Sequence, residues 1–225
     1  ITAGPLISTR NLVTYSRFIN KDYSNVKGIT LNLNKRFSDH YSIDLNYTYQ
    51  VAEGSNSNPE DEFFAQLGNN EPTLYLIPLD WDQRHLLNLS VFIGDVDWGI
   101  SALARYGTGL PYTPSITQYT ADRGITSGLQ KNSRSRPAQL NVDLKLHKTF
   151  KMFGFDVTTF LLVNNLLDNR IVVNVFGDTG KPDYTTEGKN IGYDAKRPNT
   201  VQEYLRYPWN YGEPRLVQFG FEFTF

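Results

Sequence analysis

The chain has 225 residues, 22 basic and 23 acidic side chains and a formal net charge of −1, so its charge favours no nucleic-acid partner. Cysteine is absent, which excludes disulfide scaffolds, thiolate zinc sites and cysteine nucleophiles. Aromatic residues make up 14% of the chain, with 14 Tyr and 14 Phe, a mixture typical of strands and of membrane interfaces. No apolar run reaches the roughly 20 residues that a membrane-spanning helix needs.

Apolar and polar residues alternate along much of the chain, and this period of two predicts β-strands. The first candidate, 11–19, is weak because Arg17 shares the parity of Val13 and Tyr15. The clearest is 41–51, YSIDLNYTYQV, in which apolar and polar residues alternate without a break. The same alternation predicts strands at 28–37, 86–93, 98–106, 140–148, 155–163 and 217–225. We therefore expect about eight strands.

A few residues break the alternation, with a charge on the apolar side or a large apolar residue on the polar side. One charge, Lys35, shares the apolar side of 28–37 with Ile29, Leu31, Leu33 and Phe37. The polar side of later strands carries Leu86, Phe92, Phe160 and Leu162. Inside a barrel, such residues pack against a plug or, in a small barrel, against one another, and the sequence leaves both arrangements open.

Apart from the first link, around 20–24, the connections between the predicted strands alternate between short and long. Tight turns are predicted at 38–40, 94–97 and 151–154, whereas the connections over 52–83, 107–137 and 165–214 are far longer than usual hairpin loops. Outer-membrane barrels show this alternation, with short periplasmic turns and long extracellular loops.

Strand length also fits a membrane. A strand of about 10 residues tilted by about 45° covers roughly 23 Å, close to the ~25 Å apolar band of an outer-membrane barrel. Charges such as Asp44, Arg105 and Asp143 keep to the polar parity. A soluble β-sandwich predicts the same parity but gives no reason for the connections to lengthen at one end only. We therefore favour an all-β, antiparallel transmembrane β-barrel with long extracellular loops.

The amino-acid sequences of several segments resemble a known family. The segments are NKDYSNVKGITLNLNKRF, YTYQVAEGSNSNP, PLDWDQRHLLNLSV, YGTGLPYTP, LLVNNLLDNR and YGEPRLVQFGFEFTF. Together they cover nearly the whole chain and resemble the C-terminal portion of a TonB-dependent outer-membrane receptor, in the form common among Bacteroidetes-like bacteria.

This resemblance implies a bacterial outer-membrane barrel of about 22 strands around an N-terminal plug domain. Residues 1–225 would then be about eight C-terminal strands of that barrel, without the plug. The implied function is energy-coupled nutrient uptake, with no cofactor and no catalysis. The implied partners are outer-membrane lipid, the rest of the barrel and its plug, the TonB complex through the plug, and the barrel-assembly machinery. The alternatives are a self-contained eight-stranded barrel, and a structural or adhesive barrel whose loops bind a protein or a surface.

Aromatic residues supply the candidate site positions. In the last strand the apolar side carries Phe219, Phe221, Phe223 and Phe225, and the resemblance implies that the terminal Phe belongs to a barrel-assembly signal. Amphipathic rings suited to the membrane interface are Trp81, Trp98 and Tyr106. Rings in the long connections that suit ligand contacts are Tyr112, Tyr119, Tyr207, Trp209 and Tyr211.

The densest polar cluster is Asp80, Trp81, Asp82, Arg84 and His85. It admits a cation site, but we favour pairing of Asp82 with Arg84 where the connection joins the wall, because spacing alone does not make metal ligands converge. Catalysis has little support, since His40, His85 and His147 are scattered and no Gly-x-Ser-x-Gly motif occurs. An outer-membrane protease or phospholipase therefore ranks third among the functions.

Overall fold

The computed structural model describes residues 2–7, 12–17, 22–68, 75–115, 130–152, 154–186, 200, 203 and 207–224. These residues are mainly β-structure, and the helical elements α1 (Asp61–Leu67) and η2 (Pro208–Asn210) are short. No helix within the described ranges is long and apolar enough to cross a membrane.

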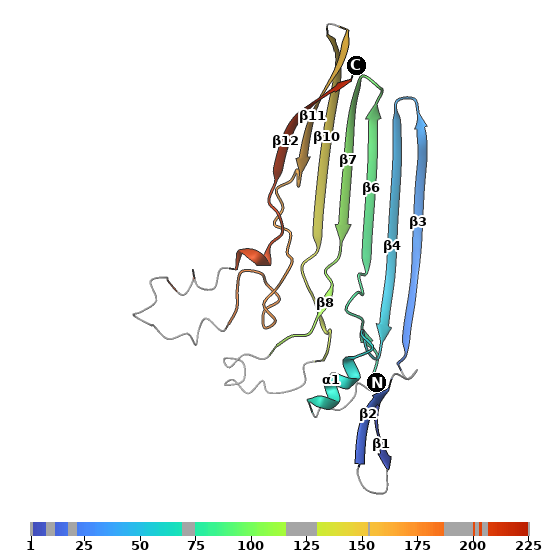
Figure 1. The fold of residues 1–225 in the computed structure, drawn as a ribbon, viewed down its shortest axis with the longest axis vertical. Helices are drawn as coiled ribbons and strands as arrows, with labels where there is room; N and C mark the ends of the chain where they lie inside the picture. Colours follow the sequence, from blue (N-terminus) through green and yellow to red (C-terminus); the bar gives the residue numbers. More distant parts are fainter. Residues whose placement is uncertain are drawn as a thin grey trace.

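Seven long antiparallel strands lie side by side in chain order and form one sheet (Figure 1). They are β3 (Ser24–Ser38), β4 (Tyr41–Gly54), β6 (His85–Gly94), β7 (Trp98–Gly107), β10 (Gln139–Met152), β11 (Phe155–Asn164) and β12 (Leu216–Thr224). The predicted all-β, antiparallel fold is thereby confirmed. β3 and β12 are the two edges, so the sheet is open and does not itself close into a barrel.

The weakly predicted first strand, 11–19, does not belong to this sheet. Its counterpart β2 (Leu12–Arg17) pairs with β1 (Thr2–Ile7) in a separate two-stranded sheet. The eighth strand of the large sheet is instead β5 (Ile77–Pro78), which pairs with Glu53 and Gly54 of β4. The alternation of side chains could not reveal a two-residue strand, because a period of two needs several residues to show.

Short and long connections alternate as predicted and lie at opposite ends of the sheet (Figure 1). At the turn end, Asp39 and His40 both have positive φ, 53° and 68°, which matches the right-handed twist of the flanking strands in a two-residue hairpin. At the connection end lie the described parts of 55–84, 108–138 and 165–215, which carry α1, β5, η2 and the small pair β8 (Pro111–Tyr112) with β9 (Arg134–Ser135).

Strand register places the apolar residues on one face of the sheet and most polar residues on the other. One apolar row crosses the sheet through Lys35, Ile43, Val91, Ala102, Leu144, Val163 and Val217. A row of the opposite face runs through Asn32, Asn46, Asn88, Arg105 and Asn141. We call these the apolar face and the polar face.

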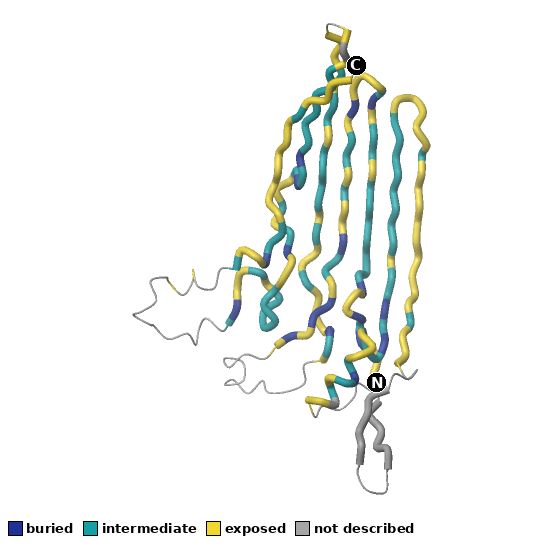
Figure 2. Tube along the Cα trace, in the orientation of Figure 1, coloured by how far each residue is buried: buried dark blue, intermediate teal, exposed yellow. Residues whose placement is uncertain are grey.

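The apolar face is largely uncovered. Ile29 is 63% exposed at one edge of the sheet and Phe223 is 64% exposed at the other. Buried hydrophobic residues belong instead to the half of the molecule toward the connection end, and they are Ala52, Ile77, Leu79, Tyr112, Val163 and Val172. Figure 2 shows exposed and half-buried positions along most of the long strands. No second sheet covers this face in the described part of the chain, as a β-sandwich would require.

Lys35 and Phe37, which the alternation placed together on the apolar side, have separate explanations. A register shift between Lys35 and Ser38 turns Phe37 toward Phe92 of the polar face, with ring centroids 5.8 Å apart, so its predicted placement was wrong. Lys35 Nζ donates to Ser38 Oγ at 2.8 Å and lies 3.7 Å from the Tyr41 ring centroid. The turn therefore satisfies the one charge in this part of the apolar face.

Large apolar residues on the polar face find partners within the sheet. The Phe160 ring lies over Gly220, where an added Cβ would come within 2.4 Å of Phe160 Cζ. Phe92 stacks on His147 with centroids 6.3 Å apart, next to Gly99, which leaves room for both rings. Glycine opposite an aromatic ring thus accommodates these residues, a cause that parity along one strand cannot reveal.

Candidate functional site

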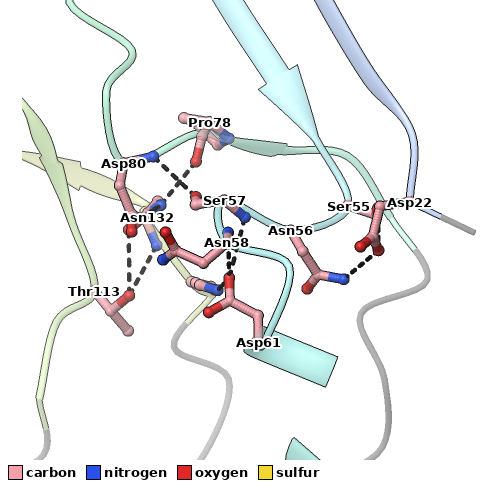
Figure 3. A network of polar contacts seen from close by, with 11 residues as sticks. Asp22, Ser55, Asn56, Ser57, Asn58, Asp61, Pro78, Asp80, Thr113 and Asn132 are labelled. Atoms are coloured by element: carbon pink, nitrogen blue, oxygen red, sulfur yellow. Dashed lines mark hydrogen bonds and ion pairs between the residues drawn. The ribbon is translucent and has the colours of Figure 1, made fainter. Parts of the chain in front are cut away.

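The connection end holds a polar network centred on Asn132 (Figure 3). Its side chain is buried, with 5% exposure, and donates from Nδ2 to Pro78 O at 2.8 Å and to Asp80 Oδ1 at 2.5 Å. Its backbone N donates to Thr113 Oγ1 at 3.1 Å. One amide therefore joins the connections on either side of β6 and β7.

Asn132 also has a positive φ of 56°, a conformation that Asn adopts more readily than most residues. The network continues to the β4–β6 connection, because Asp80 N donates to Ser57 Oγ at 3.0 Å. Sequence reasoning did not single out Asn132, since an isolated Asn in a long polar connection carries no distinguishing pattern.

Asp61 forms a second link between connections. Its Oδ2 accepts from Lys131 Nζ at 2.7 Å and from the backbone N of Ser57 at 3.0 Å and of Asn58 at 3.2 Å. Burial, the largest single effect, raises the pKa of Asp61, but these hydrogen bonds and the Lys131 charge outweigh it and hold the pKa below its ordinary value of 3.8. Asp61 is therefore ionised at neutral pH and fixes the start of α1 to the 130–136 segment.

The polar cluster at 80–85 separates into three environments. Asp82 is buried and accepts from Ala52 N at 2.8 Å and from Arg84 Nε at 2.7 Å, so the pairing favoured from the sequence is observed. Asp80 joins the Asn132 network, and His85 lies on the apolar face beside Tyr47. Among the residues that the structure describes, no group of three His, Cys, Asp or Glu side chains is placed to hold a metal ion.

Three of the ligand candidates gather in one aromatic layer at the connection end. The Tyr207 ring lies 4.6 Å from Trp209 and 5.2 Å from Phe176, centroid to centroid. Tyr112 packs its hydroxyl against Gly180, in the turn where Gly180 N donates to Phe176 O at 2.8 Å. Trp209 is 64% exposed, so this layer presents a large ring to its surroundings.

Tyr211 does not belong to this layer. Tyr211 pairs with Val172 through an isolated β-bridge, and its ring centroid lies 5.9 Å from Arg170 Cζ. Tyr119 lies outside the described residues.

Two motifs that carry the family resemblance contact each other where β11 ends and β12 begins. Asn165 Nδ2 donates to Glu213 O at 3.4 Å, and Arg215 Nη2 lies 3.4 Å from Asp168 Oδ2. Asn165 has a φ of 53° and its backbone N donates to Asp143 Oδ1 of β10 at 2.9 Å. The contacts fasten both ends of the longest connection to the sheet.

The three rings predicted for the membrane interface lie at different places in the structure. Trp98 and Tyr106 lie at opposite ends of β7 on the apolar face, each 38% exposed, whereas Trp81 lies in the connection before β6. Phe219, Phe221 and Phe223 are exposed on the apolar face of β12. Phe225 falls outside the described residues.

One cavity lies at the turn end, beside the polar face. It has a volume of about 510 Å³ and is lined by Phe37, His40, Ser42, Phe92, Asp95 and Val96. Hydrogen bonds from the backbone N of Asp97 and of Trp98, with the charges of His40 and Lys148, hold the pKa of Asp95 below its ordinary value of 3.8. These bonds order the β6–β7 turn.

Comparisons of the chain with protein-family models, with curated proteins and with solved structures found no match.

Proposed function

We propose that the chain is the C-terminal part of the wall, with external loops, of an outer-membrane TonB-dependent receptor for energy-coupled nutrient uptake. One observation carries the proposal, namely a single uncovered apolar face that extends across seven strands. Soluble monomers rarely expose contiguous apolar patches above a few hundred Å². Lipid is the surrounding that suits such a face, because each large apolar side chain removed from water contributes about 1.5 to 3 kcal/mol.

The open edges support the barrel within this proposal. β3 and β12 each have one unpaired side in the sheet, and unpaired backbone groups cost several kcal/mol each in hydrocarbon. We propose that further strands pair with both edges and complete a barrel of about 22 strands around a plug. The chain then contributes a passive wall, while energy enters through the plug and the TonB complex.

The connection end is the extracellular side in this proposal, since long loops face outward in outer-membrane barrels. Asn132 and Asp61 tie the first two connections together, and Ser115 N donates at 3.0 Å to Gly177 O of the connection that carries the exposed Trp209 layer. Tyr and Trp give large contact areas at low cost in conformational entropy, so we assign substrate capture to this layer.

A structural or adhesive barrel is the second candidate, and the same exposed Trp209 favours it, since aromatic rings are enriched at protein interfaces. Neither function needs a cofactor or catalytic group. In assays with lipid and peptide substrates we expect no turnover, and clear turnover would make an enzyme the better proposal.

A gene disruption tests uptake. A strain lacking the gene should lose accumulation of at least one radiolabelled ferric siderophore, glycan or peptide, and a protonophore should abolish the same uptake in the parent strain. The Trp209→Ala variant should accumulate less of that compound, whereas Val96→Ala, a change at the turn end, should not. Accumulation that persists without the gene, together with lost attachment to a surface, would favour the adhesive barrel.

A further inference from the structure

The apolar face carries a group of polar side chains at its border with the connection end. Register places Tyr49 of β4 opposite both Ile29 of β3 and His85 of β6. Lys27 lies two residues before Ile29 and therefore on the same face, opposite Val51. A lysine and a histidine thus lie on either side of β4 at the end of the apolar face, where Glu53 of β4 lies on the same face opposite Asn25.

Tyrosine rings fix the position of His85. Tyr47 Oη and His85 Nδ1 are 2.8 Å apart, and the His85 ring centroid lies 5.1 Å from that of Tyr49. When the Tyr47 hydroxyl donates to Nδ1, the proton of a neutral His85 is on Nε2. Nε2 then has a hydrogen to donate to a group outside the sheet.

Lys27, unlike Lys35 and Arg84, has no hydrogen-bond or ion-pair partner among the described residues. It is exposed and makes no hydrogen bond or ion pair within the described part of the chain, whereas the turn oxygens and Tyr41 occupy Lys35. At the same end of the sheet, Arg84 pairs with Asp82 at 2.7 Å and lies 3.8 Å from Glu53. Because Asp82 and Glu53 lie beside Arg84, the positive charge of Lys27 is not neutralised by either carboxylate.

The distance between Lys27 and His85 suits one phosphate headgroup. Two strand separations of roughly 4.8 Å and an offset of two residues place the Cα atoms of Lys27 and His85 about 12 Å apart. Both side chains are long enough to approach a phosphate between them, above Tyr49. Lys is a strong phosphate binder as a point charge, and among the described residues the Tyr49 hydroxyl is free to donate an additional hydrogen bond, whereas the Tyr47 hydroxyl donates to His85.

We propose that Lys27, His85 and Tyr49, with Tyr47 orienting His85, bind the phosphate headgroup of an anionic membrane lipid whose acyl chains lie on the apolar face. The inference rests on the proposed function only in requiring that lipid cover this face. It assigns to these four residues a role in choosing which lipid adjoins the wall, separate from the uptake of any nutrient.

Native mass spectrometry of the full protein in detergent tests this site. The protein is titrated with dioleoyl phosphatidylglycerol and, separately, with dioleoyl phosphatidylcholine, which has the same chains without net charge. A surface cation strengthens binding to an anionic lipid by about fivefold, so Lys27→Gln should lower the phosphatidylglycerol preference by that factor. Lys27→Arg should retain the phosphatidylglycerol preference. Adding His85→Gln to Lys27→Gln should lower the preference below that of the single variant.

The matched control is Lys151→Gln, which removes an exposed lysine of β10 on the polar face and should leave the preference unchanged. Equal binding of the two lipids, or equal losses in Lys27→Gln and Lys151→Gln, would overturn the proposed site. Competition by inorganic phosphate at concentrations that leave acyl-chain binding intact would likewise show a free-phosphate site instead. A protein that retains neither lipid contradicts the membrane function itself, so the two failures are distinguishable.

Discussion

Asn132 shows how one side chain can order several connections. Its amide reaches Pro78 O and Asp80, its backbone reaches Thr113, and its φ is 56°. Burying such an amide is favourable only when its partners are present, because an unsatisfied buried polar group costs about 1 to 3 kcal/mol.

We expect Asn132→Gly to lose the side-chain hydrogen bonds while keeping the positive φ, and Asn132→Ala to lose both. Hydrogen exchange in 75–84 should accelerate in the glycine variant, by a factor that corresponds to about 1 to 3 kcal/mol, and more in the alanine variant. The exposed neighbour Ser133 provides the control Ser133→Ala. Unchanged protection of 75–84 in both Asn132 variants would contradict this role.

Asp61 gives the connection end a defined pH dependence. Its pKa in the folded chain is below 3.8, so the Asp61 contacts stabilise the fold above the unfolded-state pKa and are lost as pH falls through the folded-state value. We expect protection of the 57–61 amides to be constant from neutral pH to about 4 and to fall below that. Lys131→Gln should shift the fall to higher pH, and Asp61→Asn should remove it. A fall centred near neutral pH would contradict the assignment.

Among the single elements, the alternating strands could be predicted from the sequence, but the contacts that depend on pairing between strands could not. The residues of 41–51 fixed which side chains share a face, because the period of two is a property of the extended backbone. The bulge that turns Phe37 toward Phe92, and the two-residue β5, depend on pairing between strands and leave no such trace. The aromatic layer could not be predicted either, because Phe176 contacts Tyr207 only through the folding of one long connection.

Packing of β12 on β11 depends on Gly220, over which the Phe160 ring lies. Gly220→Ala should displace that ring and destabilise the edge strand by about 1 to 3 kcal/mol, measured as the shift in urea midpoint in lipid vesicles. Phe160→Leu in the same chain should relieve part of the loss, because it removes the clashing atoms. Gln218→Ala, on the same face of β12, is the control. Additive effects of Gly220→Ala and Phe160→Leu would refute this packing.

At the scale of the whole molecule, the sheet is one layer with two chemically different faces and two unpaired edges. A charge on the face toward hydrocarbon is expected to cost far more than a charge on the opposite face. Leu89, in the central row with Leu45 and Ala104, faces the apolar side, and its neighbour Ser90 faces the polar side. Leu89→Arg should therefore cost about 2 to 4 kcal/mol in vesicles, and Ser90→Arg much less. Equal costs would contradict the assignment of the faces.

The most direct test of the central claim, that lipid covers the apolar face, uses the absence of cysteine from the chain. Single cysteines at 87, 88, 89, 90 and 91 of β6 can be spin-labelled in the protein reconstituted into vesicles, and their accessibility to oxygen and to a water-soluble nickel chelate compared. Lipid on the apolar face predicts high oxygen accessibility at 87, 89 and 91, and lower oxygen accessibility at 88 and 90. Uniform access of the nickel chelate to all five positions, or the opposite alternation, would contradict it.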